Sequence, residues 1–122
     1  MIHRRPLIAV VDDDESVRKA LIRLLHTSEF EVNEFASGEE FLESLAIRRP
    51  DCVILDFHMP GLNGRDVQRR LTLRKIDLPV IVVTAHDHPA SRQQCLEDGA
   101  IAWLLKPLCR DDLLASISKA IS

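Results

Sequence analysis

The sequence of 122 residues has no excess of basic residues and no long apolar run. Its 16 Lys and Arg stand against 19 Asp and Glu, which gives a formal net charge of −3. Because binding along a nucleic-acid backbone requires a basic surface, we expect DNA contact only through another domain. No apolar run approaches the roughly 20 residues of a membrane span, and the N-terminal residues Met1–Arg5 contain no signal-peptide core. We therefore expect no membrane contact.

Paired or regularly spaced cysteines are also missing. Cys52, Cys95 and Cys109 are odd in number and follow no metal-ligand spacing. We interpret all three as reduced packing residues of a cytoplasmic protein rather than as ligands or disulfide partners. The sequence has no internal repeat, low-complexity tract or linker, and its length suits a single domain over residues 1–122.

What the sequence does contain is a regular alternation of strand and helix signals. Short apolar runs typical of buried strands alternate with apolar residues at helical spacing. The predicted strands are Leu7–Val11, Phe30–Phe35, Cys52–Leu55, Val80–Val83 and Ile101–Leu105. The predicted helices are roughly Asp14–Thr27, a helix from Ser37 that stops before Pro50, Arg65–Leu73, Pro89–Asp98 and Asp111–Ile121.

This alternation predicts an α/β fold, a doubly wound parallel sheet of five strands with five helices on its two faces. The run Phe30–Phe35 alternates apolar and polar residues as an edge strand does, which favours the flavodoxin-like strand order 2-1-3-4-5. Two helix boundaries carry local signals. Ser37 and Glu40 form the pattern of a capping box, in which each side chain accepts from a helical N–H, and Gly99 follows the fourth helix as a stop signal.

Polar residues stand where four of the predicted strands end. Asp12 and Asp13 follow the first strand, Asp56 the third, Thr84 the fourth and Lys106 the fifth. The carboxyl ends of parallel strands share one edge of a sheet, where ligands bind. In the order 2-1-3-4-5 the first and third strands are neighbours, so the three carboxylates meet at that edge.

These residue types fit a divalent cation and a phosphoryl group. Neighbouring carboxylates cannot all stay ionised without a counter-cation, and an all-oxygen set suits Mg²⁺. Asp56 is the candidate nucleophile, because carboxylates form aspartyl phosphates; Lys106 would neutralise charge and Thr84 would donate a hydrogen bond. Acidic residues at the start of a helix explain Asp14 and Glu15 better than a cation site does. That explanation does not account for Asp56, which stands at the end of another strand.

Four segments of the chain resemble the signature segments of response-regulator receiver domains of two-component signalling. The segments occur in the family's order and span the whole chain: Val11-Asp-Asp13, Asp56-Phe-His-Met-Pro-Gly-Leu-Asn-Gly64, Val83-Thr-Ala85 and Leu105-Lys-Pro107. The resemblance implies a phosphorylated switch domain rather than a classical enzyme, although such domains assist their own phosphorylation and dephosphorylation.

The resemblance also implies a role for each site residue. Asp56 would accept a phosphoryl group from a sensor histidine kinase. Asp13 and Asp56 would bind Mg²⁺ directly, together with the backbone carbonyl of His58, and Asp12 would act through water. His58 and His86 hold positions that tune phosphate lifetime in this family, but each is also a plausible ordinary loop residue.

The remaining implied roles concern phosphoryl contact and switching. Thr84 and Lys106 would contact the phosphoryl group, and the peptide bond before Pro107 would be cis. Trp103 occupies the aromatic switch position, where the family usually has Tyr or Phe, so that Thr84 and Trp103 would move together on phosphorylation. Packing of a strand residue against a helix explains Trp103 as well.

Several other functions compete with this interpretation. A Mg²⁺-dependent aspartyl-phosphate phosphohydrolase resembling the haloacid-dehalogenase family would need Asp where His58 stands. A flavodoxin-like flavin carrier would need a Ser/Thr-rich phosphate loop where the acidic residues stand, and a pure docking module would not need the intact site. The sequence motifs look most like those of receivers that precede a helix-turn-helix DNA-binding domain. We also expect homodimerisation on phosphorylation. A stand-alone single-domain regulator stays open.

Overall fold

A computed structural model describes residues 5–122 and contains the predicted five-stranded parallel sheet, in the order β2-β1-β3-β4-β5. The strands are β1 (Leu7–Val11), β2 (Glu31–Phe35), β3 (Cys52–Asp56), β4 (Val80–Thr84) and β5 (Ala102–Leu105). The helices are α1 (Glu15–His26), α2 (Gly38–Ser44), α3 (Gly64–Leu73), α4 (Pro89–Glu97) and α5 (Arg110–Ile121). The α/β fold class and the strand order predicted from the sequence are both confirmed.

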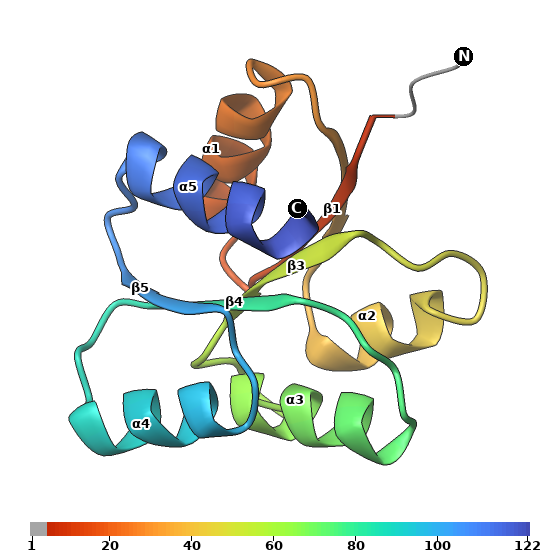
Figure 1. The fold of residues 1–122 in the computed structure, drawn as a ribbon, viewed down its shortest axis with the longest axis vertical. Helices are drawn as coiled ribbons and strands as arrows, with labels where there is room; N and C mark the ends of the chain where they lie inside the picture. Colours follow the sequence, from red (N-terminus) through yellow and green to blue (C-terminus); the bar gives the residue numbers. More distant parts are fainter. Residues whose placement is uncertain (1–4) are drawn as a thin grey trace.

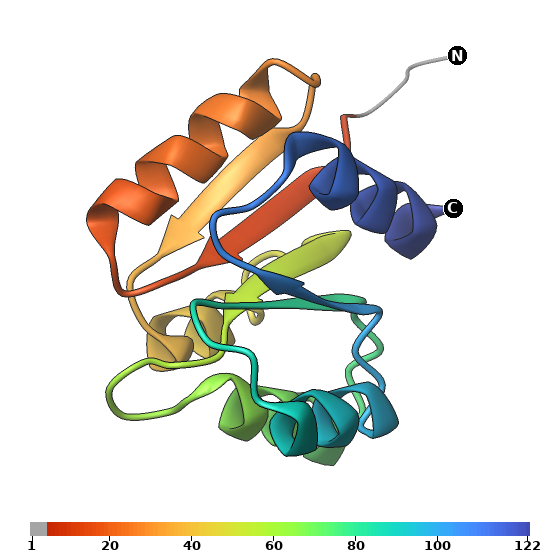
Figure 2. The same ribbon diagram turned by 90° about the vertical axis from the view of Figure 1, so that its left-hand side faces the viewer.

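The helices cover the two faces of the sheet unequally. Helices α1 and α5 pack on one face, and α2, α3 and α4 pack on the other (Figures 1 and 2). Strands β1, β3 and β4 are buried along their whole length. Because successive strand residues point to opposite faces, Ile8 and Val10 enter the α1–α5 core whereas Ala9 and Val11 enter the other.

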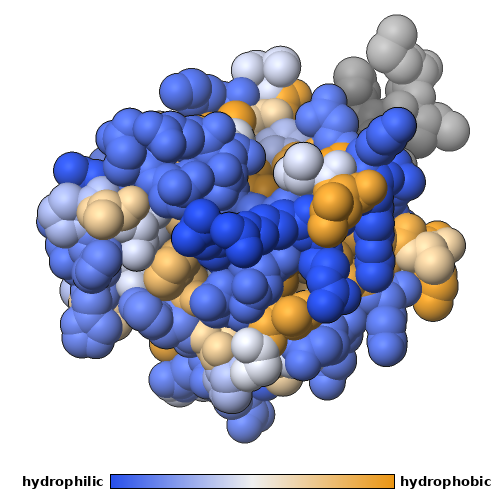
Figure 3. Space-filling model, turned by 90° about the horizontal axis from the view of Figure 1, so that it is seen from below, coloured by the Kyte–Doolittle hydropathy of each residue, from blue (hydrophilic) through white to orange (hydrophobic). Residues whose placement is uncertain are grey.

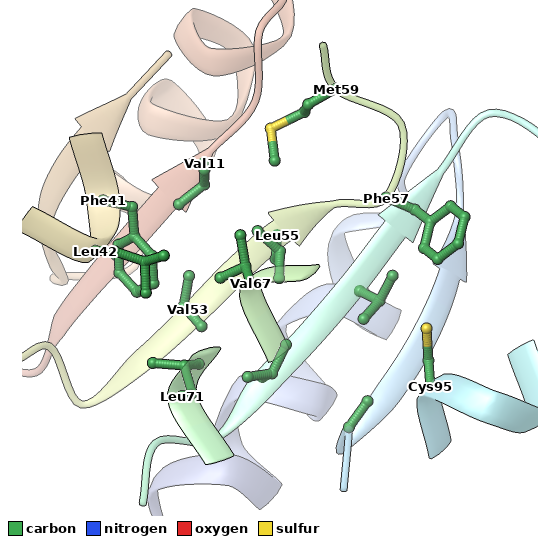
Figure 4. Packing of buried hydrophobic residues seen from close by; sticks show 14 of the residues in the cluster. Val11, Phe41, Leu42, Val53, Leu55, Phe57, Met59, Val67, Leu71 and Cys95 are labelled. Atoms are coloured by element: carbon green, nitrogen blue, oxygen red, sulfur yellow. The ribbon is translucent and has the colours of Figure 1, made fainter. Parts of the chain in front are cut away.

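The larger core lies between the sheet and helices α2, α3 and α4 (Figure 4). Phe41 from α2 and Val67 from α3 are fully buried there, and they meet strand residues such as Val53 and Leu55. Burying a side chain of this size stabilises the fold by about 1.5–3 kcal/mol. This packing fixes the positions of the strands whose ends carry the polar residues.

Helix α4 is attached to the rest of the fold by few interactions. Cys95 is its one buried side chain, and the Cys95 carbonyl oxygen accepts a hydrogen bond of 3.2 Å from Gln68 Nε2 of α3. The helix begins at Pro89, as predicted, and it is followed by Gly99, whose φ of +105° is a backbone conformation that favours glycine.

Helix α2 stops before Pro50, as predicted, and one expectation about its start is wrong. The helix ends at Ser44, because the N–H groups of residues 45–47 bond to carbonyls three residues back and tighten the chain into turns. Ser37 does cap the helix by accepting from the Glu40 N–H. The Glu40 carboxylate accepts instead from the N–H of Ala36, which lies outside the helix at the end of β2.

Surface features correct one further expectation. Cys52 and Cys95 are buried, and burial raises the pKa of their thiols to about 12 and about 11. Cys109 is exposed at the N-terminus of α5, so it is not a packing residue. No helix within residues 5–122 has the length and apolar character needed to cross a membrane. The face drawn in Figure 3 is mostly hydrophilic, and its hydrophobic residues form separate patches.

Candidate functional site

The strand register brings the polar strand ends together at one edge of the sheet. Val11 of β1 pairs with Leu55 of β3, so the next residues along each strand, Asp12 and Asp56, emerge side by side. On the other side of β3, Asp56 pairs with Val83 of β4, and Thr84 follows Val83 directly. Asp56 and Thr84 therefore end β3 and β4, while Asp12 and Asp13 directly follow β1 and Lys106 directly follows β5.

Three carboxylates form the centre of this site. Ligand oxygens of Asp12, Asp13 and Asp56 all lie within 4.8 Å of one another, and no other group of three or more such residues occurs within residues 5–122. Asp12 and Asp56 are only 1% and 4% exposed, whereas Asp13 is exposed. One carboxylate thus faces solvent while two line the interior, an arrangement through which a hydrated cation can enter.

Lys106 bridges the two buried carboxylates. Its Nζ donates to Asp12 Oδ2 at 2.8 Å and to Asp56 Oδ1 at 3.1 Å. Burial disfavours the charged ammonium, but the hydrogen bonds to Asp12 and Asp56 and their negative charges outweigh burial and raise the pKa of Lys106. The ammonium therefore stays positive and lies in contact with the candidate nucleophile.

The charge balance of the site explains why it should bind a cation. Burial, together with the negative charge of Asp12, raises the pKa of Asp56 to about 6, although Lys106 works in the opposite direction. One ammonium does not neutralise three carboxylates. An all-oxygen ligand set of this kind, open on the Asp13 side, fits Mg²⁺, which binds through one or two carboxylates and keeps several waters.

The loop that carries Asp12 and Asp13 is held by interactions that the sequence analysis missed. Arg18 Nη1 donates to the Asp12 carbonyl oxygen at 2.7 Å, and Arg18 Nε pairs with Glu34 of β2 at 3.0 Å. Asp14 caps α1, and hydrogen bonds from Ser16 lower the pKa of its carboxyl. The sequence signal that could have predicted this contact is a basic residue, Arg18, one turn into a helix and opposite an acidic residue, Glu34, of the neighbouring strand.

The loop after Asp56 is closed by Gly64, the first residue of α3. Its N–H donates to the Phe57 carbonyl oxygen at 2.9 Å. A Cβ atom at this position would lie 3.0 Å from both the Asp56 carbonyl oxygen and Phe57 Cα, closer than most side chains tolerate. An Asn63–Asp66 capping box also starts α3, which the sequence analysis missed although the pattern is legible.

Thr84 reaches the site edge and is fully buried. Its hydroxyl accepts from the His86 N–H and donates to the His86 carbonyl oxygen, both at 3.3 Å. The Thr84 carbonyl oxygen in turn accepts from the Lys106 N–H at 2.8 Å. The peptide bond between Lys106 and Pro107 is cis, as the resemblance implies.

Aromatic rings continue from the site toward β5. The Trp103 ring lies 5.4 Å from the Phe57 ring, centroid to centroid, and it is half-buried against the larger core. Its Nε1 is buried without a hydrogen-bond partner among the described residues. The Phe57 ring also lies 4.9 Å from the His58 ring, and the His58 ring lies 6.1 Å from the His86 ring.

The chain is similar to known proteins over nearly its whole length. A family model described as the response regulator receiver domain matches residues 8–118. Over 108 residues the chain is 43% identical to the response regulator MprA of Mycolicibacterium vanbaalenii, a match that covers 88% of this chain and 47% of that protein. It is 36% identical over 119 residues to the DNA-binding transcriptional regulator NtrC of Escherichia coli K12, which covers 98% of this chain and 25% of NtrC.

A solved structure shows the same likeness. The crystal structure of FixJ-N superposes with a TM-score of 0.90 at 29% identity, covering 98% of this chain and 95% of that one. The chain spans about half the length of MprA and a quarter of NtrC. The similarity to those two proteins therefore concerns only part of each.

Proposed function

Because this chain belongs to the response regulator receiver domain family, we propose that Asp56 accepts a phosphoryl group from the phosphohistidine of a sensor histidine kinase. The observation that carries the proposal is the Lys106 ammonium held between Asp12 and Asp56 at 2.8 and 3.1 Å, beside the third carboxylate of Asp13. Charge neutralisation and positioning are the main requirements of phosphoryl transfer.

In the proposed reaction an oxygen of Asp56 attacks the phosphorus atom. The new bond joins that oxygen to phosphorus as the phosphorus–nitrogen bond of phosphohistidine breaks, and its electron pair leaves with the imidazole of the kinase. Lys106 keeps a positive charge next to the phosphoryl oxygens throughout. The Thr84 hydroxyl, now bonded to the His86 backbone, would turn to a phosphoryl oxygen.

The carboxylates are suited to hold the cation that such a reaction needs. We propose that Asp13, Asp56 and the backbone carbonyl of His58 bind Mg²⁺ directly and that Asp12 acts through water. The bound ion supplies positive charge that balances the carboxylates and the incoming phosphoryl oxygens. The all-oxygen ligand set within 4.8 Å supports this assignment.

Relatives suggest what the switch controls. Two relatives are described as a response regulator and a DNA-binding transcriptional regulator, and the chain covers only part of each. We propose that this receiver controls a DNA-binding output domain in the cytoplasm, through homodimerisation when Asp56 is phosphorylated. The net charge of −3 agrees with DNA contact through that other domain.

Labelling with acetyl phosphate tests the acceptor residue. Incubation with acetyl phosphate and Mg²⁺ should add the mass of one phosphoryl group, and the adduct should be labile to base. Asp56→Asn should abolish the adduct, and EDTA should suppress it. Asp111→Asn is the matched control, because Asp111 is exposed on α5. Full labelling of Asp56→Asn, or labelling that persists in EDTA, would contradict the proposal.

The single tryptophan provides a test of switching. When the Thr84 hydroxyl turns to the phosphoryl group, its contact with the β4–α4 loop is lost and the Trp103 ring gains room to turn. Phosphoryl contacts drive this change only if they are stronger in one state. Adding beryllofluoride, a phosphoryl mimic, with Mg²⁺ should change the Trp103 emission.

The corresponding variants separate switching from binding. Thr84→Ala should abolish the change in emission, whereas Thr72→Ala on α3 should retain it, since the Thr72 hydroxyl donates to the Gln68 carbonyl oxygen of its own helix. An unchanged spectrum in a protein that binds beryllofluoride would show that activation does not involve Trp103.

A further inference from the structure

The loops that follow β3 and β4 each carry an exposed histidine, and the two imidazole rings lie next to each other. His58 and His86 have ring centroids 6.1 Å apart and planes at 71°. His58 comes two residues after Asp56, and His86 comes two residues after Thr84. Strands β3 and β4 are paired, with Asp56 opposite Val83, so the loops that carry the two histidines begin at the same edge of the sheet.

The backbone of both loops is anchored close to the two rings. The Phe57 N–H, next to His58, donates to the Val83 carbonyl oxygen at 2.9 Å. The backbone of His86 is held on both its N–H and its carbonyl by the Thr84 hydroxyl. The Phe57 ring additionally packs edge-on against His58 at 4.9 Å. The two imidazoles therefore project from fixed positions, and their exposure leaves ring nitrogens accessible.

From this geometry we propose that His58 and His86 together bind one divalent transition-metal ion of the Ni²⁺, Cu²⁺ and Zn²⁺ class. Metal–nitrogen bonds of about 2.0–2.1 Å place the centroids of two rings on one ion roughly 5–6.5 Å apart. The observed 6.1 Å falls in this range, and exposed side chains adjust their rotamers within nanoseconds. Water completes the coordination.

The ligand chemistry separates this site from the carboxylate cluster. Imidazole suits Ni²⁺, Cu²⁺ and Zn²⁺, whereas Mg²⁺ prefers oxygen ligands and keeps its waters. The carboxylates of Asp12, Asp13 and Asp56 form the all-oxygen group, and the two imidazoles lie outside it. The inference does not rest on phosphorylation of Asp56, because it uses only the positions of the two rings.

Two other histidines of the described chain serve as references. His26 is exposed in the last turn of α1, away from both loops. His88 already uses Nδ1, which accepts from the Ser91 N–H at 3.2 Å and caps α4. His3 lies outside the described residues, so every protein in the test carries His3→Gln.

The test is a titration with Ni²⁺ in the presence of saturating Mg²⁺, followed by calorimetry and by Trp103 emission. We expect one Ni²⁺ per chain and quenching of Trp103, because Phe57 lies in ring contact with both Trp103 and His58. His58→Gln and His86→Gln should each weaken Ni²⁺ binding at least tenfold. His26→Gln, the matched control, should leave the affinity unchanged.

A further variant distinguishes this site from the carboxylate cluster. Asp56→Asn removes a carboxylate from that cluster and should keep the Ni²⁺ affinity and the quenching. Unchanged affinity in His86→Gln, loss of binding in Asp56→Asn, or no binding to the parent would each overturn the proposal. Because both histidines are exposed, the substitutions should leave the melting temperature unchanged. A second variant, His86→Ala, checks that the loss of Ni²⁺ affinity results from removal of the imidazole ring.

Discussion

Replacing Asp56 by Asn should make the metal-free protein more stable at neutral pH. The Asp56 carboxylate is 4% exposed and lies beside Asp12, and these two conditions raise its pKa from 3.8 to about 6. Asn has nearly the same shape, carries no charge and still offers Lys106 an acceptor oxygen. Lys106 also keeps its bond to Asp12 in the variant.

The magnitude and sign of the effect follow from that pKa. At about 1.36 kcal/mol per pKa unit, ionised Asp56 costs the folded state roughly 3 kcal/mol. Because the pKa of Asp56 is higher in the folded than in the unfolded protein, the free energy of unfolding of the parent falls by this amount as the pH rises from about 4 to above 6. Asp56→Asn does not titrate, so its advantage should grow from near zero at pH 4 to about 3 kcal/mol at pH 7.5.

Urea unfolding in EDTA at several pH values measures this difference. Mg²⁺ should offset much of it, since an ion at 100 times its dissociation constant stabilises the parent by about 2.7 kcal/mol and the variant by less. Asp111→Asn should show neither effect, because its carboxylate is exposed. A variant that is less stable than the parent at pH 7.5 in EDTA would refute the reasoning, as would a gain that does not depend on pH.

Two further substitutions test other parts of the site. Lys106→Met leaves Asp12 and Asp56 buried without their cation, so the free energy of unfolding in EDTA should fall by about 3 kcal/mol and partly recover in Mg²⁺. Gly64→Ala places a Cβ atom 3.0 Å from backbone atoms of Asp56 and Phe57. It should cost about 1–3 kcal/mol in urea unfolding and slow acetyl phosphate labelling; wild-type values for both would contradict the close approach.

The sheet could be predicted from the sequence because strands buried on both faces consist of apolar residues. Strands β1, β3 and β4 are apolar along their whole length and are buried on both faces, so their runs coincide with the observed strands to within one residue. Strand β5 reads in the same way but is only partly buried, and its Leu105 is 46% exposed. An apolar run cannot distinguish an edge strand from a central one.

The gathering of the site residues was predictable, but their contacts were not. Strand order and strand ends suffice to bring Asp12, Asp13 and Asp56 together, because only backbone register is involved. The bridge made by Lys106 and the hold of Arg18 on the Asp12 carbonyl depend on side-chain rotamers and on distances across the sheet. The Lys106 bridge joins residues 94 positions apart in the chain and leaves no local pattern.

The weak attachment of α4 has a consequence for the dynamics of the molecule. With Cys95 as its one buried side chain and Gln68 as a polar tie, α4 can open while exposing little of the larger core. Its backbone amides should therefore exchange with deuterium through local opening, whereas those of β1, β3 and β4 should exchange only through global unfolding. The helix that comes next after Thr84 in the chain is thus attached weakly enough to rearrange at a low cost in free energy.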